Sequence, residues 1–256
     1  MRRFRIFTAA AVIAGAALAL GGSPAGAANK NTCPPPPPPG STVNGGLLVT
    51  AQCTLVDVTV NGGATVTSTG RLELERSTIR GGVDVQPGGE LDSGHTSSSA
   101  VGTFLPSTID GGVNSDHGID IDLQNATVNG RTTIVGNAAG FSPTICKSTL
   151  NGSVTISDIN SPNPFFPTIV GDPGEPIQAG PVPDCPGNTI NGSLFVTNSR
   201  FLEIEGNSID GSVFLDTSTI ELAANNISGS VHCNNATFYT DGDPAPNNVG
   251  GSFDCP

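Results

Sequence analysis

The 256-residue sequence contains no tryptophan, one tyrosine and eleven phenylalanines, and only 12% of its residues are charged. So little aromatic volume argues against a wide core built around large rings, and it favours a narrow core of small branched side chains. Val, Ile and Leu are plentiful, and sparse charge combined with that content argues against intrinsic disorder.

Basic side chains are also scarce, with 10 Lys and Arg against 22 Asp and Glu and a net charge of −12. Removal of Arg2, Arg3 and Arg5 with an expected signal segment leaves seven basic and 22 acidic side chains, a net charge of −15. This charge argues against nucleic acid and anionic membranes as partners. The sequence also lacks a Walker loop, an HExxH motif, a CxxC pair and the Ser-His-Asp order, so no motif indicates an enzyme.

Residues 1–27 have the features of a secretory signal peptide. Arginines come first, an apolar stretch follows over residues 8–20, and Ala25-Gly26-Ala27 forms a small-residue cleavage site. The stretch is too short for a stable membrane span, and no second run of that length occurs. We therefore expect a secreted protein, extracellular or at the cell surface, with no membrane span in the mature chain. Residues 28–40, with prolines from 34 to 39, are expected to form a stiff spacer ahead of a domain at 41–256.

A short phrase recurs ten times in that domain: Thr, a branched apolar residue, Asn or Asp, Gly, then Gly or Ser before alternating apolar residues. Its glycines are Gly45, Gly62, Gly81, Gly111, Gly130, Gly152, Gly192, Gly211, Gly229 and Gly251. A repeat near 19 residues with internal alternation predicts one stacked coil per copy. We predict an all-β fold, a single-stranded parallel β-helix (β-solenoid) of about ten short coils. Irregular coil lengths favour right-handed winding, and the extra residues are expected to form loops near 86–107, 157–187 and 234–248.

The register separates core from surface. The apolar residues two before each glycine, and those two and four after it, are expected to stack in the core. The Asn-Gly step is expected to form the corner, with glycine adopting positive φ. The corner asparagines should stack as an amide ladder formed by Asn44, Asn61, Asn129, Asn151 and Asn191.

Six cysteines in an exported chain indicate three disulfides, with fifteen possible connectivities. Cys233 and Cys255 both follow their repeat glycine by four residues, and Cys146 and Cys185 precede theirs by six and seven. Adjacent coils lie about 4.8 Å apart, within the reach of a disulfide. The register therefore predicts Cys233–Cys255 and Cys146–Cys185, which leaves Cys33–Cys53.

The phrases at residues 42–46, 77–83 and 247–255 (Asn-Asn-Val-Gly-Gly-Ser-Phe-Asp-Cys) resemble a group of exported bacterial parallel β-helix proteins, common in actinobacteria, with no assigned activity. The resemblance covers residues 41–256 and implies a scaffold without implying a site. The short coils are more distantly similar to bactofilins, which polymerise end to end but are cytoplasmic and disulfide-free. Pectate-lyase-like enzymes share the broad fold, and fold alone does not carry activity across.

An acidic column is predicted eight residues before the repeat glycine, at Glu73, Asp122, Asp184, Glu203, Glu221 and Asp243. Carboxylates on neighbouring strands repel one another, and a bound Ca²⁺ would relieve that repulsion. Glu203, Glu205 and Glu221 are therefore candidate calcium ligands, and no cofactor other than this candidate calcium is expected. The alternative is a solvated acidic surface.

The densest polar cluster spans residues 116–122. Asp120 and Asp122 are expected on one strand face, about 7 Å apart, near the separation of an inverting carboxylate pair. Asp116, His117, Asp120 and Asp122 are therefore candidate catalytic residues for glycoside hydrolysis. The alternative is a turn with exposed acids, which the scarcity of basic substrate-binding residues favours.

These observations predict an exported, non-catalytic β-helix that acts as a structural or surface-interaction module. The expected partner is an extracellular polysaccharide or a cell-envelope component. Two alternatives stay open: a polysaccharide-active enzyme, hydrolase or lyase, that uses residues 116–122, and a filament protein that self-associates through stacked coils.

Overall fold

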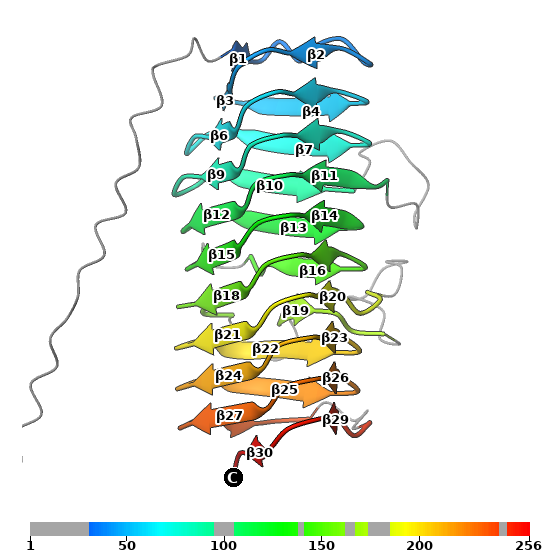
Figure 1. The fold of residues 1–256 in the computed structure, drawn as a ribbon. Helices are drawn as coiled ribbons and strands as arrows, with labels where there is room; N and C mark the ends of the chain where they lie inside the picture. The colour runs from blue at the N-terminus through cyan, green and yellow to red at the C-terminus, as the bar shows by residue number, and fades with distance from the viewer. Residues whose placement is uncertain (1–30, 95–104, 138–140, 162–166, 174–184, 241–244) are drawn as a thin grey trace, which may run out of the picture.

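The structure is a computed structural model that describes residues 31–94, 105–137, 141–161, 167–173, 185–240 and 245–256. These residues form thirty β-strands and no helix, and every pairing between the named strands is parallel. The strands build three sheets that run side by side along one rod of about ten coils (Figure 1). The predicted all-β parallel β-helix is therefore confirmed, whereas its right-handed winding stays a prediction. The expected signal peptide lies outside the described residues.

We call the three sheets A, B and C. Nine coils contribute one strand to each sheet, in the order B, A, C along the chain, while β1 precedes these coils and β29 and β30 follow them. Sheet A contains β1 (Asn31–Cys33), β3 (Leu47–Val49), β6 (Ala64–Val66), β9 (Val83–Val85), β12 (Val113–Asp116), β15 (Thr132–Val135), β18 (Val154–Ser157), β21 (Leu194–Thr197), β24 (Val213–Asp216), β27 (Val231–Asn234) and β30 (Phe253–Asp254). Sheet B contains β2 (Thr42–Val43), β5 (Thr59–Val60), β8 (Thr78–Ile79), β11 (Ser107–Ile109), β14 (Ala126–Val128), β17 (Thr149–Leu150), β20 (Thr189–Ile190), β23 (Ser208–Ile209), β26 (Asn226–Ile227) and β29 (Asn248–Val249).

Sheet C contains β4 (Gln52–Val56), β7 (Arg71–Glu75), β10 (Glu90–Ser93), β13 (Asp120–Gln124), β16 (Thr144–Cys146), β19 (Thr168–Val170), β22 (Arg200–Glu205), β25 (Thr219–Ala223) and β28 (Thr237–Phe238). Inward positions of all three sheets carry Val, Ile and Leu, which stack on their equivalents in the next coil and form one continuous core. In sheet B, for example, Val60 pairs with Ile79 and Val128 with Leu150, and all four are fully buried. The predicted core columns are thus confirmed, because alternation places every second side chain inside.

Glycine is needed at the corner between sheets B and A for a different reason from the one expected. Among the repeat glycines only Gly45 has positive φ, at 91°. The others are required by close stacking: a Cβ on Gly62 would lie 2.7 Å from the carbonyl carbon of Gly45, and one on Gly152 would lie 2.6 Å from the oxygen of Gly130. The expectation of positive φ at this corner was wrong, and glycine is needed there because successive corners touch.

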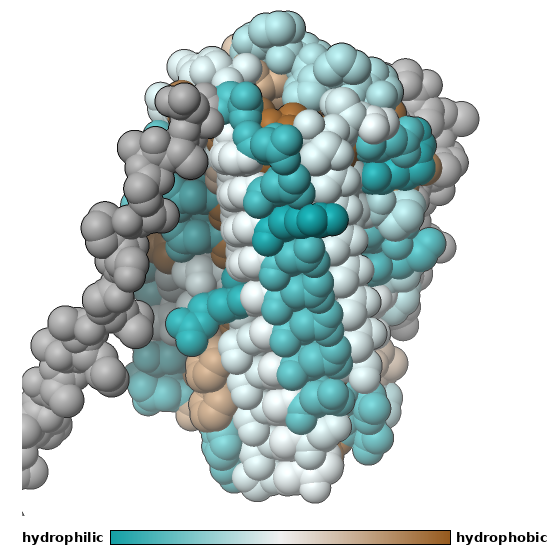
Figure 2. Space-filling view, turned by 45° about the horizontal axis from the view of Figure 1, so that its top comes forward, coloured by the Kyte–Doolittle hydropathy of each residue, from teal (hydrophilic) through white to brown (hydrophobic). Residues whose placement is uncertain are grey.

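Corner amides form the predicted ladder. Asn61 donates to Asn44 (2.7 Å), Asn151 to Asn129 (2.6 Å) and Asn191 to Asn151 (2.6 Å), and Asp110 accepts from Asn129 in the same column. A hydrophilic stripe follows the direction of the stacked coils on the visible face, bordered by columns of near-neutral residues (Figure 2).

A second ladder, buried and not predicted, lies at the turn from sheet C to sheet B. Serine hydroxyls occupy this position in several of the earlier coils and asparagines occupy it in the later ones. Ser77, Ser107 and Ser148 each accept from a backbone N–H of a neighbouring coil. Asn188, Asn207 and Asn225 each donate to the next asparagine and to a backbone carbonyl. The ladder satisfies backbone groups that the turn would otherwise leave unpaired.

Three disulfides join the cysteines in the predicted pairs. Cys33–Cys53, Cys146–Cys185 and Cys233–Cys255 have Cα–Cα distances of 5.8, 5.0 and 4.9 Å. Disulfides of this kind persist in oxidising compartments, so they indicate an oxidising environment such as the cell exterior.

The boundaries of the predicted loops differ in the structure. Each segment contains a strand of sheet C: β10 within 86–107, β19 within 157–187 and β28 within 234–248. These strands were missed because the extra residues follow them or lie on both sides of them, which changes their distance from the repeat glycine. Leu91 still pairs with Leu72 and Val170 with Ile204, as the core requires. In the described part of the chain no helix is long and apolar enough to cross a membrane.

Candidate functional site

Acidic residues gather on the outer face of sheet C, where β7, β10 and β13 lie side by side. Glu73, Asp92 and Asp122 occupy the same position on the three strands, and Arg71, Glu90 and Asp120 occupy the position two residues earlier. We call these six residues the carboxylate cluster. Because neighbouring strands lie about 4.8 Å apart, five carboxyl groups share a small area with one guanidinium.

Arg71 holds the cluster together. Its Nε lies 2.9 Å from Glu73, and its terminal nitrogens lie 3.4 Å from Asp92 and 3.5 Å from Glu90. Partial burial opposes the charge of Arg71, but the carboxylates of Glu73, Asp92 and Glu90 raise its pKa above the usual range. Glu73 is buried and also accepts from Gln52 (3.1 Å) and Thr54 (2.5 Å), so its carboxylate is fixed in place.

The remaining acids of the cluster are pushed toward protonation. Desolvation, followed by the charges of Asp120 and Asp92, raises the pKa of Asp122 well above its usual range, against a hydrogen bond with Thr144 and the charge of Arg71. Desolvation and Glu90 likewise raise the pKa of Asp120, with Arg71 and the Ile121 N–H opposing the shift. A carboxylic acid beside carboxylates can donate a proton, which is the chemistry expected of a general acid.

The predicted catalytic residues divide into two groups. Asp120 and Asp122 belong to the carboxylate cluster, on the outward face of one strand as predicted. Asp116 is instead the last residue of β12 in sheet A, and His117 follows it at the corner, where His117 Nδ1 lies 2.6 Å from Asp116 Oδ1 and both side chains are more than half exposed. His117 has positive φ and packs against Gly136 of the next coil. Asp116 and His117 therefore contact each other at the corner and are not members of the carboxylate cluster.

The predicted calcium ligands lie farther along sheet C. Glu203 pairs in register with Glu221, as predicted, and Glu205 pairs with Ala223. All three glutamates are buried. Ile169, not Asp184, precedes Glu203 in this column, and Asp184 and Asp243 lie outside the described residues. Within the described ranges no three His, Cys, Asp or Glu side chains are arranged to hold a metal ion, and calcium binding stays a prediction.

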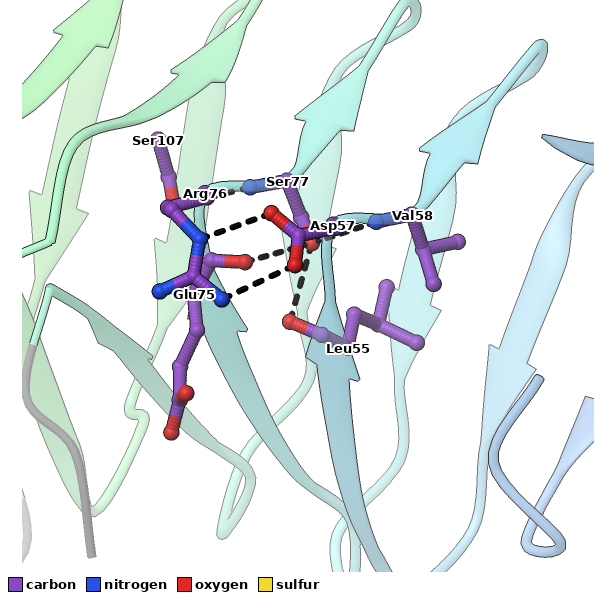
Figure 3. Close-up of polar contacts among 7 residues, drawn as sticks. All are labelled: Leu55, Asp57, Val58, Glu75, Arg76, Ser77 and Ser107. Atoms are coloured by element: carbon purple, nitrogen blue, oxygen red, sulfur yellow. Dashed lines mark hydrogen bonds and ion pairs between the residues drawn. The ribbon is translucent and has the colours of Figure 1, made fainter. Parts of the chain in front are cut away.

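An ion pair at the turn from sheet C to sheet B was not predicted. Arg76 donates Nε to Asp57 Oδ1 (2.7 Å) and Nη2 to Asp57 Oδ2 (2.8 Å), in a bidentate contact between adjacent coils (Figure 3). Both residues have positive φ, so equivalent turns present the two side chains to each other. The hydrogen bond with Arg76 lowers the pKa of Asp57. Beside the pair, Ser77 Oγ accepts from Val58 N and donates to the carbonyl of Leu55 or Glu75 (Figure 3).

Sequence reasoning missed Arg71, Glu90 and Asp92 as members of the cluster. The insertion after β10 moves Asp92 away from the spacing that located Glu73 and Asp122. A signal was nevertheless present, because Glu90-Leu91-Asp92-Ser93 repeats the alternation of Arg71-Leu72-Glu73-Leu74. Aligning strands by this alternation, instead of counting from the glycine, would have placed them together.

Comparison with protein-family models, with curated proteins and with solved structures finds no significant match for this chain.

Proposed function

We propose that this protein is an exported, non-catalytic β-solenoid that acts outside the cell as a structural or surface-interaction module. Its expected partner is an extracellular polysaccharide or another component of the cell envelope. The resemblance of residues 41–256 to exported bacterial β-helix proteins supports the same role.

The observation that carries this proposal is that covalent bonds and hydrogen-bond ladders join neighbouring coils. Disulfides join coils near both ends of the described rod and in its second half, and side-chain ladders follow two of its corners. Such a rod holds its outer faces in fixed positions, which lowers the entropic cost of binding an extended partner. Arg71 ties Glu73, Asp92 and Glu90 together, which is a stabilising role for those acids.

Co-sedimentation tests this proposal. The mature protein is incubated with envelope material from the producing organism, and bound protein and released reducing sugar are measured together. We expect retention on the envelope material without release of sugar. Retention no greater than that of an unrelated acidic protein would contradict the proposal.

Glycoside hydrolysis is the second candidate, and the raised pKa of Asp122 beside Asp120 favours it. In that case Asp122 would protonate the leaving oxygen and Asp120 would activate water. Release of reducing sugar that Asp122→Asn abolishes and Asp210→Asn preserves would establish the enzyme and overturn the non-catalytic role. Asp210 is a suitable control because it is exposed at a corner away from sheet C.

A further inference from the structure

A row of aromatic rings lies on the outer face of sheet A. Phe195, Phe214 and His232 occupy the same outward position on β21, β24 and β27. Phe195 and Phe214 stack with centroids 4.9 Å apart and planes within 5°, and His232 stacks on Phe214 at 5.0 Å. Phe214 remains 37% exposed. A small apolar patch lies toward the lower end of the visible face, separated from the hydrophilic stripe by a column of near-neutral residues (Figure 2).

The row begins with a step in side-chain size. On the coil before Phe195 the same position holds Thr155, and on the coil before that it holds Thr133. Because the rings stack face to face, one face of Phe195 meets Phe214 and the opposite face is directed toward Thr155. A threonine is much smaller than a ring, so the Phe195 face stands above a floor of short side chains. We call Phe195, Thr155 and Thr133 the aromatic ledge.

Uncharged hydroxyl groups border the ledge. Ser157 and Thr197 pair in register on one side, and Ser153 and Ser193 lie at the corner on the other. Strands β18 and β21 carry no charged side chain. An aromatic face beside hydroxyl donors and acceptors suits a ligand with apolar C–H faces and hydroxyl edges. Arg131 lies at the corner two residues before Thr133, and the acidic character of the whole chain is what disfavours an anionic ligand.

We propose that the aromatic ledge binds a neutral saccharide, with one sugar ring stacked on the face of Phe195 that is directed toward Thr155 and its hydroxyls bonded to the bordering serines and threonines. Phe214 and His232 support the Phe195 ring from behind, so it is held in position before the ligand arrives. This inference rests on the proposed function, whose partner class it narrows to uncharged polysaccharide.

Retention on insoluble polymers tests the ledge. Purified mature protein is mixed with cellulose or chitin as neutral probes, and its mobility is measured in gels containing polygalacturonate as the acidic probe. We expect retention on at least one neutral polymer and no retardation by polygalacturonate. Phe195→Ala should weaken retention at least tenfold, whereas Phe141→Ala, which removes a phenylalanine outside the ledge that is 48% exposed, should leave it unchanged.

A second variant separates binding from folding. Thr155→Lys places a long side chain over the Phe195 face without altering any core residue, and it should also abolish retention while the melting temperature stays close to that of the parent. Three results would overturn the proposed binding by the ledge. These are no binding to either neutral polymer, retardation by polygalacturonate alone, and unchanged retention of both variants. Envelope binding that survives both substitutions would leave the interaction module standing and place its binding surface elsewhere.

Discussion

Asn207 shows how single side chains fasten the coils. It is buried, and its side chain makes four hydrogen bonds: the oxygen accepts from the backbone and side-chain nitrogens of Asn188, and the amide nitrogen donates to Val170 O and Asn225 Oδ1. Asn151 belongs to the exposed corner ladder, where water can replace each lost partner. Two asparagines in similar ladders therefore differ in how much stability they supply.

We expect Asn207→Ala to lower the free energy of unfolding by about 3 kcal/mol, because it leaves several buried polar groups unsatisfied. Asn151→Ala should cost less than about 1 kcal/mol. Denaturant titration of the two variants at equal protein concentration measures the difference. Equal losses would show that burial does not set the strength of these ladders.

Sheet C shows what happens when one element gathers charge of one sign. Three adjacent strands place five carboxyl groups around Arg71, and burial together with these neighbouring charges raises the pKa of Asp120 and Asp122. The turn beside this sheet has the opposite result, because Arg76 faces Asp57 alone and lowers its pKa. Aspartates thus have opposite effects on pH-dependent stability, and burial together with the charge of the neighbouring groups decides the sign.

Asp122→Asn should raise the melting temperature at neutral pH by about 2–4 °C, the change that roughly 1 kcal/mol produces in a chain of this size. Folded Asp122 holds its proton to a higher pH than unfolded Asp122, so its favourable contribution is full at low pH and is lost as the pH rises through the folded pKa. The gain from the amide should therefore shrink as the pH is lowered through that pKa. Melting curves against pH measure it, with Asp210→Asn as the matched control.

Asp57→Asn should show the reverse dependence. The folded pKa of Asp57 is depressed, so its contribution is present above the unfolded pKa and is lost as the pH falls through the folded pKa. The variant should be less stable than the parent at neutral pH and equal to it in strong acid. A neutral-pH loss that persists unchanged in acid would assign the effect to packing instead of charge.

At the scale of the whole molecule, each coil contacts mainly the coil before it and the coil after it. Stability in such a rod is approximately a sum of coil and nearest-neighbour terms, so damage stays local. Cys146–Cys185 is buried and joins neighbouring coils across 39 residues of sequence, which include the coil with β19. This disulfide therefore links adjacent coils in the part of the rod where the length of the repeat is least regular.

Replacing both Cys146 and Cys185 with Ala should cost up to about 4 kcal/mol of local stability through the entropy of the opened loop. Hydrogen exchange should accelerate in β16, β19 and β20 and stay unchanged in β4 and β7, because those strands lie several coils away. The matched variant, with Cys233 and Cys255 both replaced by Ala, should affect only the last coils. Uniform loss of protection along the rod would show that it unfolds as one cooperative unit.

Much of the architecture could be predicted because the fold repeats. Each coil places Val60, Ile79 or Leu150 in the same inward position, so alternation and a repeated glycine define the core columns without any knowledge of distant contacts. The same register identified two of the three disulfides, since Cys233 and Cys255 fall at one position of successive coils, and it left Cys33–Cys53 as the third pair. Local pattern suffices where each coil meets only its neighbours.

The sequence by itself determined the class of fold, the core columns, the corner amide ladder and the cysteine pairs, because these depend on side-chain period and coil register. Only the tertiary structure decided which polar groups meet where insertions break that register. It brought Asp92 and Glu90 beside Arg71, replaced Asp184 with Ile169 in the acidic column, and separated the contacts of His117 from those of Asp122. It also showed that the corner glycines are needed for contact between coils, and that Phe195 faces a short side chain on the coil before it. These features depend on which strands are neighbours in the stack. Where insertions vary the length of a coil, the spacing of residues along the chain does not identify those neighbours.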